Sequence, residues 1–502
     1  MTAQSLYLTE YISLYREWAD AYYDYLFSNR KEKERTWQDK ARQLYTWLAD
    51  EKRYKDIEKS DSKELQSLYK WMTCFQMKQD ELEEILRLET EVFHYYLTAR
   101  KQNRVIEQQL GKEVNTYKRK SLWKETKSLG KKIAPLLLQL KQKRNQVLQR
   151  QGFPNFYHWY LDYLGLNESK VNLLLQFLKE ATDPYYSELK GEWDKQLGKK
   201  FDLRPEGIRC WHYDDSLIRT VPPLYIEPIV NDLLTKPLKE VLEQTRDTFR
   251  LKGLLELVVR SDPFEQKLSG IQDMSILHSQ TKVDEYHLVG SYLFDLGRNY
   301  VFSQLQSHTL LNRIKDLPIQ YAWGIYFEQL LYQRDWLKEI IKVPEAQLET
   351  ISDENFSKQM KLAHLIKLRY HLAVAMFERD FYQKQDLNWD QHWWDIVERI
   401  QFIPRPETYR APDWAVSTWL GVIPNSSLVY LCGVLLSMQL KESVEEDLFT
   451  PLTVQTVKKL APVIPNKLYP SFEEEEMKQT IFHHWPKPIP KPASRPRRAP
   501  AK

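Results

Sequence analysis

The chain has 502 residues, 13% of them aromatic and 28% charged. It has only 14 glycines, where an average usage of about 7% would give roughly 35. This aromatic content excludes a chain without a packed core, and the scarcity of glycine disfavours hairpins and phosphate-binding loops. The net charge of +4 arises at the end, because residues 487–502 carry six basic side chains and no acid. The body before them sums to about −2, so we expect a packed helical body that does not bind nucleic acid through its charge.

The three cysteines, Cys74, Cys210 and Cys432, are far apart and odd in number. They predict neither a disulfide framework nor a cysteine zinc site. The chain shows no basic segment followed by an apolar run near its start, and no stretch of about 18 apolar residues. We therefore expect a cytoplasmic protein that does not enter a membrane.

Apolar residues spaced by three and four predict helices over residues 7–25, 65–96, 122–147 and 170–196. Strand-like alternation is weak and appears only near residues 208–213 and around Phe402, so any β element is small. The fold class predicted by this pattern is all-α.

Proline and glycine clusters divide the chain at residues 152–154, 204–207, 222–228 and 403–412. We expect residues 1–120 to form an N-terminal helical lobe that is continuous with a helical core over residues 121–485. Residues 486–502 form a basic, proline-rich tail that cannot build a core.

Three groups of residues carry a resemblance to known proteins. The first is a Trp, a helix that ends in Arg-Asn, and a Gly-Phe-x-Asn-x-Tyr link, within residues 123–161. The second is RCWHYDD, residues 209–215. The third is Asp413, Trp414, Pro424, Tyr430 and Gln439. In this order they resemble the zinc metallopeptidases of the angiotensin-converting enzyme, oligoendopeptidase F and thimet oligopeptidase type, over roughly residues 5–480.

The resemblance implies two helical lobes that flank a deep central cleft, with a zinc ion at its floor. Such enzymes bind zinc through His-Glu-x-x-His, because two imidazoles four residues apart on a helix reach one ion while the Glu takes a proton from the bound water. No two of the eleven histidines here are three or four residues apart. We therefore expect the metal site to be lost and the protein to hold no zinc cofactor.

The segment YLFDLGRNYVF, residues 292–302, best matches the place of that motif. Phe294 then stands for the first His, Asp295 for the Glu and Arg298 for the second His. Tyr321 takes the place of the third ligand, and an offset of one residue would put Gln320 or Ala322 there, neither of which is a good zinc ligand. If this alignment is right, Phe294, Arg298 and Tyr321 converge on one spot.

Other family positions are also altered. Glu328 keeps a second acid after Tyr321, whereas Ser426 and Ser427 stand where the family has adjacent tyrosines, and only Tyr430 survives. The resemblance places His212 and Tyr213 near the cleft. The candidate cleft residues are therefore His212, Tyr213, Asp295, Arg298, Tyr321, Glu328 and Tyr430.

Structural interpretations of the same residues remain open. Phe294 fills space as any core residue does, or it plugs the vacant metal site. Asp295 and Arg298 form a local ion pair, or they face the cleft and bind the carboxylate and the amine of a peptide. A replacement metal site built from His287 with Asp295 or Glu328 is a remote alternative.

These residues suggest a catalytically inactive pseudopeptidase that binds peptides or protein segments in a helical cleft. One alternative is a structural or interaction protein whose cleft is filled by side chains such as Phe294, Tyr321 and Trp323. Another is a working peptidase with a rearranged active site. The basic tail is expected to be a solubilising appendage.

Overall fold

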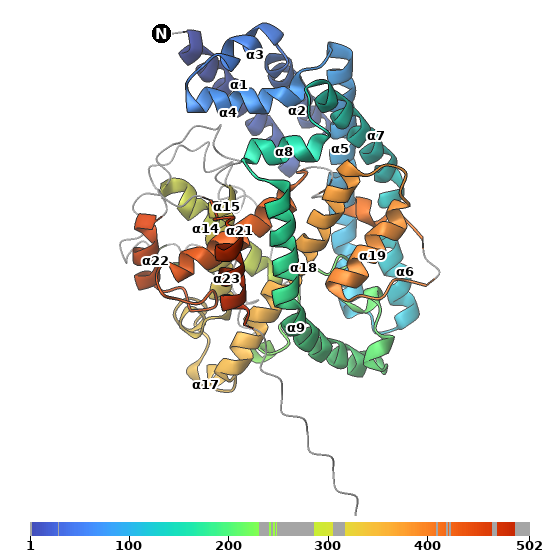
Figure 1. The fold of residues 1–502 in the computed structure, drawn as a ribbon. Coiled ribbons are helices and arrows are strands. Elements are labelled where there is room, and N and C mark those ends of the chain that lie inside the picture. The colour runs from blue at the N-terminus through green and yellow to red at the C-terminus, as the bar shows by residue number, and fades with distance from the viewer. Residues whose placement is uncertain are drawn as a thin grey trace, which may run out of the picture.

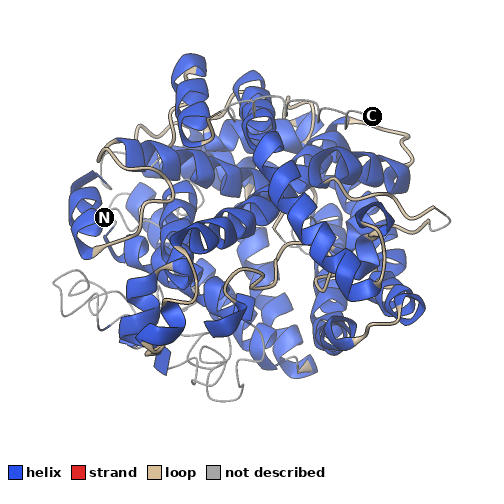
Figure 2. Cartoon of the chain, turned by 90° about the horizontal axis from the view of Figure 1, so that it is seen from below, coloured by secondary structure: helices blue, strands red, loops and turns tan. Residues whose placement is uncertain are grey.

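The computed structural model describes residues 3–28, 30–229, 240–241, 244–245, 247, 286–304, 317–407, 410–417, 420, 423–463 and 469–486. Within these ranges every regular element is a helix, which confirms the all-α fold class (Figure 2). The described chain has no strand near residues 208–213 or Phe402, where the sequence shows weak strand-like alternation. Cys210–His212 form a 3₁₀ turn, and Phe402 ends a helix in the left-handed region with φ 52°. Alternating apolar residues thus reflect a tight turn and a helix end.

The helix bounds are as follows: α1 Ala3–Ser28, α2 Lys31–Leu48, α3 Glu51–Glu58, α4 Lys63–Met72, α5 Gln79–Lys112, α6 Thr116–Lys127, α7 Gly130–Arg150, α8 Phe156–Leu164, α9 Glu168–Phe201, α14 Tyr286–Gln304, α15 Leu317–Glu328, α16 Arg334–Trp336, α17 Glu345–Leu348, α18 Asp353–Gln383, α19 Trp389–Gln401, α21 Ser426–Glu442, α22 Val454–Leu460 and α23 Glu474–His484.

Side-chain caps explain several helix starts. The side chains of Asp50, Ser62, Asn115, Asn155 and Asn388 each accept a hydrogen bond from a backbone N–H in the first turn of the helix that follows. Such caps satisfy amides that have no partner within the helix.

Two of the expected long helices are in fact pairs. The apolar stripe over residues 65–96 is divided between α4 and α5, because the chain turns through a 3₁₀ segment, Thr73–Phe75. The stripe over residues 122–147 is divided between α6 and α7 at Ser128 and Leu129. Helices α6 and α7 bury their apolar faces in one cluster, whereas the buried residues of α4 and of α5 belong to different clusters.

The centre of the molecule is α18, which is buried along most of its length and packs on α9, α19 and α21 (Figure 1). Helices α14, α15 and α21 form a second group, in which α15 packs between the other two. Helix α23 lies against both α9 and α21 and so joins the two groups. These contacts place α14, which contains residues 292–302, next to the helices that carry Tyr321 and Tyr430.

Helices α1 to α4 gather at one end of the molecule, at the top of Figure 1. They contribute to two small apolar clusters, one around Leu44 and Leu68 and one around Tyr25 and Trp37, and the second cluster includes Phe93 of α5. Helix α2 also packs on α5, and α4 on α8. The division of the chain into residues 1–120 and 121–485 stays a prediction.

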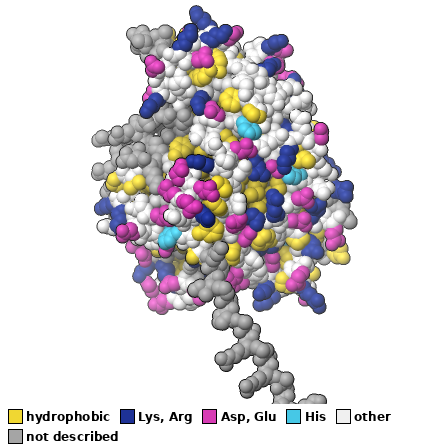
Figure 3. Space-filling model, viewed as in Figure 1, with side chains coloured by type: hydrophobic (Ala, Val, Ile, Leu, Met, Phe, Trp, Pro, Cys, Tyr) yellow, Lys and Arg dark blue, Asp and Glu magenta, His cyan; other side chains and the backbone are white. Residues whose placement is uncertain are grey.

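Across the described ranges, none of the helices combines the length and the apolar character that crossing a bilayer takes. On the face shown in Figure 3, acidic and basic side chains are interspersed with apolar ones. A mixed pattern of this kind agrees with the near-neutral charge of the body.

Candidate functional site

Two glycines bring α14 and α15 into close contact. A Cβ atom on Gly297 would overlap the backbone of Trp323, and a Cβ atom on Gly324 would come within 2.8 Å of the ring of Phe294. The ring of Phe294 therefore lies directly on the backbone of α15. A larger residue at either glycine would push the two helices apart.

Three aromatic rings meet between α14, α15 and α21. The centroid of the Phe294 ring lies 5.9 Å from that of Tyr321 and 6.3 Å from that of Tyr430, and the two tyrosines are 6.0 Å apart. The guanidinium carbon of Arg298 lies 5.2 Å from the Tyr321 ring centroid. Phe294 and Arg298 thus both lie beside Tyr321, and the family alignment itself stays a prediction.

Asp295 and Arg298 form the expected local ion pair, with Nη1 of Arg298 at 3.3 Å from Oδ1 of Asp295. Burial raises the pKa of the Asp295 carboxyl, and the charge of Arg298 opposes that rise. The Nε atom of Arg298 is buried and has no hydrogen-bond partner within the described part of the chain. The 3.3 Å contact with Asp295 therefore uses only one of the five N–H donors of this guanidinium.

Helix α18 adds two residues that the sequence interpretation missed. Nζ of Lys367 donates to Glu328 at 2.8 Å and lies 4.1 Å from the centroid of the Phe294 ring. One turn later, the His371 ring stacks on Tyr430 with centroids 4.0 Å apart, and burial lowers the pKa of His371. The signal available in the sequence was their spacing of four, which places both on one face of a helix.

His212 and Tyr213 lie in another part of the molecule, against α6 and α9. The Tyr213 hydroxyl donates to Asp194 at 2.7 Å, and the His212 ring lies 5.0 Å from that of Phe201. Nδ1 of His212 accepts the backbone N–H of Arg209 at 2.8 Å, and burial, with Arg119 and Arg209, lowers the pKa of His212 to about 4. These contacts give both residues a structural role. The side chain of His287 lies outside the described residues.

A cavity of about 440 Å³ lies between the N-terminal helices and α8, α14 and α15. We call it the aromatic chamber. Its described lining includes Arg298, Gln320 and Ser426, so it adjoins the cluster around Phe294. Eleven of its lining residues are aromatic: Tyr15, Trp18, Tyr22, Trp37, Tyr45, Trp71, Phe75, Phe93, Phe156, Trp159 and Tyr160. In the sequence, most of these residues belong to the apolar stripes of predicted helices. Periodicity does not distinguish an apolar stripe that packs in a core from one that lines a cavity.

The other charges of the aromatic chamber are already paired. Arg144, part of the Arg-Asn motif, donates to Glu89 at 2.8 Å and to the Tyr382 hydroxyl at 3.1 Å. The Tyr45 hydroxyl donates to the same glutamate at 3.0 Å. Asn145, the next residue in that motif, bonds the backbone of Tyr382 and caps the start of α8.

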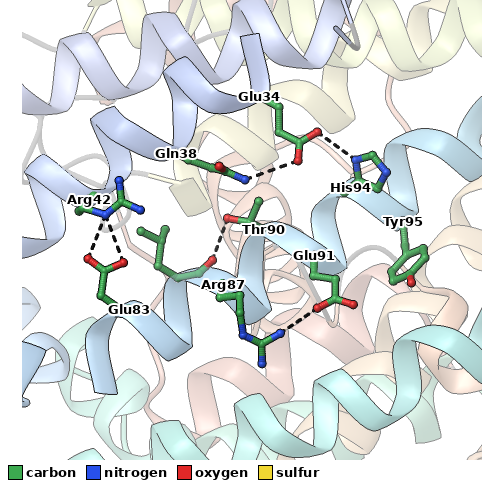
Figure 4. Close-up of a pocket in the computed structure, with 10 residues that line it drawn as sticks. Glu34, Gln38, Arg42, Glu83, Arg87, Thr90, Glu91, His94 and Tyr95 are labelled. Atoms are coloured by element: carbon green, nitrogen blue, oxygen red, sulfur yellow. Dashed lines mark hydrogen bonds and ion pairs between the residues drawn. The ribbon is translucent and has the colours of Figure 1, made fainter. Parts of the chain in front are cut away.

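A second hollow, of about 410 Å³, is a polar groove between α2 and α5 (Figure 4). Its charged side chains face one another in pairs. Glu34 lies 3.0 Å from His94, Arg42 lies 2.9 Å from Glu83, and Arg87 lies 3.0 Å from Glu91. The first two pairs join α2 to α5, so this groove is an interface between helices and leaves little charge for a ligand.

One group of described residues has ligand atoms close enough to share a metal ion: Asp447, His483 and His484, within 4.8 Å. However, Nδ1 of His484 accepts the N–H of Leu448, and its Nε2 faces the carbonyl oxygen of Met438, both at 3.1 Å. A neutral imidazole has one donor and one acceptor nitrogen. His484 therefore has no lone pair left for a metal, and the group fits zinc poorly.

Searches of protein-family models and of curated proteins find no match to this chain. The resemblance to zinc metallopeptidases consequently rests on the motifs alone.

Proposed function

We propose that this protein is a catalytically inactive relative of the zinc metallopeptidases and binds a peptide or protein segment in the aromatic chamber. The observation that carries the proposal is the position of Arg298. It belongs to the altered metal motif, and it also lines a cavity of about 440 Å³ with eleven aromatic residues. Pockets of about 300–1,000 Å³ with mainly apolar walls and a few polar groups are typical of ligand sites.

The inactivity is supported by the residues that occupy the motif. Phe294 and Tyr321 are 9% and 6% exposed, and their rings pack on each other. Neither side chain is a normal zinc ligand. Nζ of Lys367 lies 4.1 Å from the centroid of the Phe294 ring, and its positive charge opposes the binding of a metal cation beside this residue.

The second candidate is a scaffold protein that binds no ligand. The cluster of Phe294, Tyr321 and Tyr430 favours it, because these side chains fill the space beside residues 292–302. The aromatic chamber beside the cluster favours binding. The two candidates differ in whether this chamber takes up a ligand, which a peptide-library screen on the purified protein measures directly.

Zinc stoichiometry of the purified protein tests the inactivity. We expect no tightly bound zinc after dialysis, and one zinc per chain would contradict the proposal. A fluorogenic peptide assay, with and without chelator, is expected to show no hydrolysis above buffer. Activity that Asp295→Ala abolishes would establish a working peptidase with a rearranged site.

A further inference from the structure

The aromatic chamber contains one charged side chain whose hydrogen-bonding capacity is largely unused. Among the described residues, Arg298 donates one hydrogen bond, of 3.3 Å to Asp295, and contacts the ring of Tyr321, while its Nε is buried without a hydrogen-bond partner. A guanidinium has five N–H donors arranged to match a carboxylate. The chamber therefore presents donors to whatever enters it.

Charge points to the sign of the ligand. Among the described residues that line the chamber, the ionised side chains are Glu89, Arg144 and Arg298. Glu89 and Arg144 neutralise each other at 2.8 Å. Arg298 is paired as well, with Asp295 at 3.3 Å, but Asp295 is not among the described lining residues, so the guanidinium is the member of that pair that borders the cavity. An anionic group is the complementary occupant.

The walls also indicate which part of a peptide fits. Two polar groups of the lining already have partners: the Tyr45 hydroxyl donates to Glu89, and the Ser426 hydroxyl donates to the carbonyl oxygen of Ile423 at 2.6 Å. The indole N–H groups of Trp18 and Trp37 are buried and have no hydrogen-bond partner among the described residues. A peptide backbone buried among aromatic walls would leave its N–H and C=O groups unpaired, which is costly. A side chain has no such groups along its stem.

Building on the proposed function, we infer that the aromatic chamber receives two side chains of a partner segment. One is a carboxylate side chain that pairs with Arg298. The other is an aromatic or large apolar side chain that packs on the rings. The backbone of the segment stays at the mouth of the chamber, in water. The ring centroid of Tyr321 lies 5.2 Å from the guanidinium carbon of Arg298, and this cation–π contact helps to hold the guanidinium in place.

The test uses peptides blocked at both ends, each with one Phe and one Glu separated by varying numbers of glycine and serine residues. Partner sets replace Glu by Gln, or Phe by Ala, and a further set ends in a free Phe carboxylate without any Glu. Binding is followed by the protein's own tryptophan fluorescence, since Trp18, Trp37, Trp71 and Trp159 line the chamber.

We expect a Phe–Glu peptide to bind at least about tenfold more tightly than its Gln partner, since a charge-assisted pair is about twice as strong as a neutral bond. Arg298→Gln should remove this preference, and Arg298→Lys should restore part of it. The matched control is Arg150→Gln, which removes an exposed guanidinium paired with Glu81 outside the chamber. It should behave as the wild type does.

Equal binding of the Glu and Gln peptides to the wild type would overturn the inference while leaving peptide binding intact, and this comparison needs no variant. Retention of the preference in a folded Arg298→Gln protein would also overturn it. Binding of only the free-carboxylate set would assign Arg298 to a chain end instead. If no peptide binds, the proposed function itself fails.

Discussion

The ring of Phe294 lies against the α-carbon of Gly324, where a Cβ atom would come within 2.9 Å of three ring carbons. The ring cannot move aside easily, because Tyr321 and Tyr430 pack on it. The pair Phe294 and Gly324 therefore sets how closely α14 and α15 approach.

Gly324→Ala should destabilise the protein by about 1–3 kcal/mol through overpacking. Gly191→Ala, inside α9, where a Cβ meets nothing within 4 Å, should instead stabilise it by about 0.5–1 kcal/mol through helix propensity. Denaturant unfolding of both variants measures the difference. Equal effects at the two positions would show that the ring yields.

Phe294→Ala alone should cost about 3–5 kcal/mol, because it leaves a cavity in the cluster. The double variant with Gly324→Ala should cost less than the sum of the two single changes, since the added methyl group then occupies space that the ring has left. Additive costs would mean that the two residues do not share this space.

Glu378 on α18 should make stability fall as pH rises. It is 1% exposed and accepts the N–H of Asn425 at 2.7 Å, and burial raises its pKa to about 8. The folded protein thus holds a proton that the unfolded chain releases near 4.5. The contribution of Glu378 to the free energy of unfolding is therefore fully present below pH 4.5 and is lost as the pH rises through about 8.

Glu378→Gln keeps the acceptor but cannot ionise. Its free energy of unfolding, relative to the wild type, should therefore increase between about pH 5 and about pH 8.5. Glu354→Gln, at the exposed start of the same helix, is the control and should show no such trend. A difference that is independent of pH would contradict the raised pKa of Glu378.

His212 should titrate in the opposite sense. Burial lowers its pKa to about 4 from an ordinary value of 6.5, so its contribution to stability is present above 6.5 and is lost as pH falls through about 4. Nuclear magnetic resonance of the imidazole protons of His212 should give a pKa well below the ordinary value of 6.5. An unshifted His212 would mean that this segment is open to water.

Replacing the buried Arg119 should strongly destabilise the protein. This arginine is fully buried and donates to the backbone oxygens of Trp211 and His212 at 2.8 and 3.0 Å, and to Asp214 at 3.0 Å. Arg119→Leu leaves these acceptors unpaired and should cost about 3–5 kcal/mol. The matched change Arg150→Leu, at an exposed pair, should cost less than about 1 kcal/mol. Similar losses in both would refute a buried role for Arg119.

Local rules explain much of what could be predicted. The helix over residues 170–196 follows from its apolar stripe, and the start of α8 follows from Asn155. The break between α4 and α5 escaped the sequence interpretation, because apolar spacing continues through Thr73–Phe75. His212 was assigned to the cleft by resemblance, whereas its ring packs near α6 and α9.

The sequence alone determined the helical class and the absence of two histidines spaced to share a zinc ion, since both depend on residue types at short separations. Only the tertiary structure brought Lys367 and His371 to Phe294 and Tyr430, and opened a cavity beside Arg298. Contacts and hollows of this kind depend on how distant helices pack. The spacing of residues within one helix does not predict how that helix packs against distant ones.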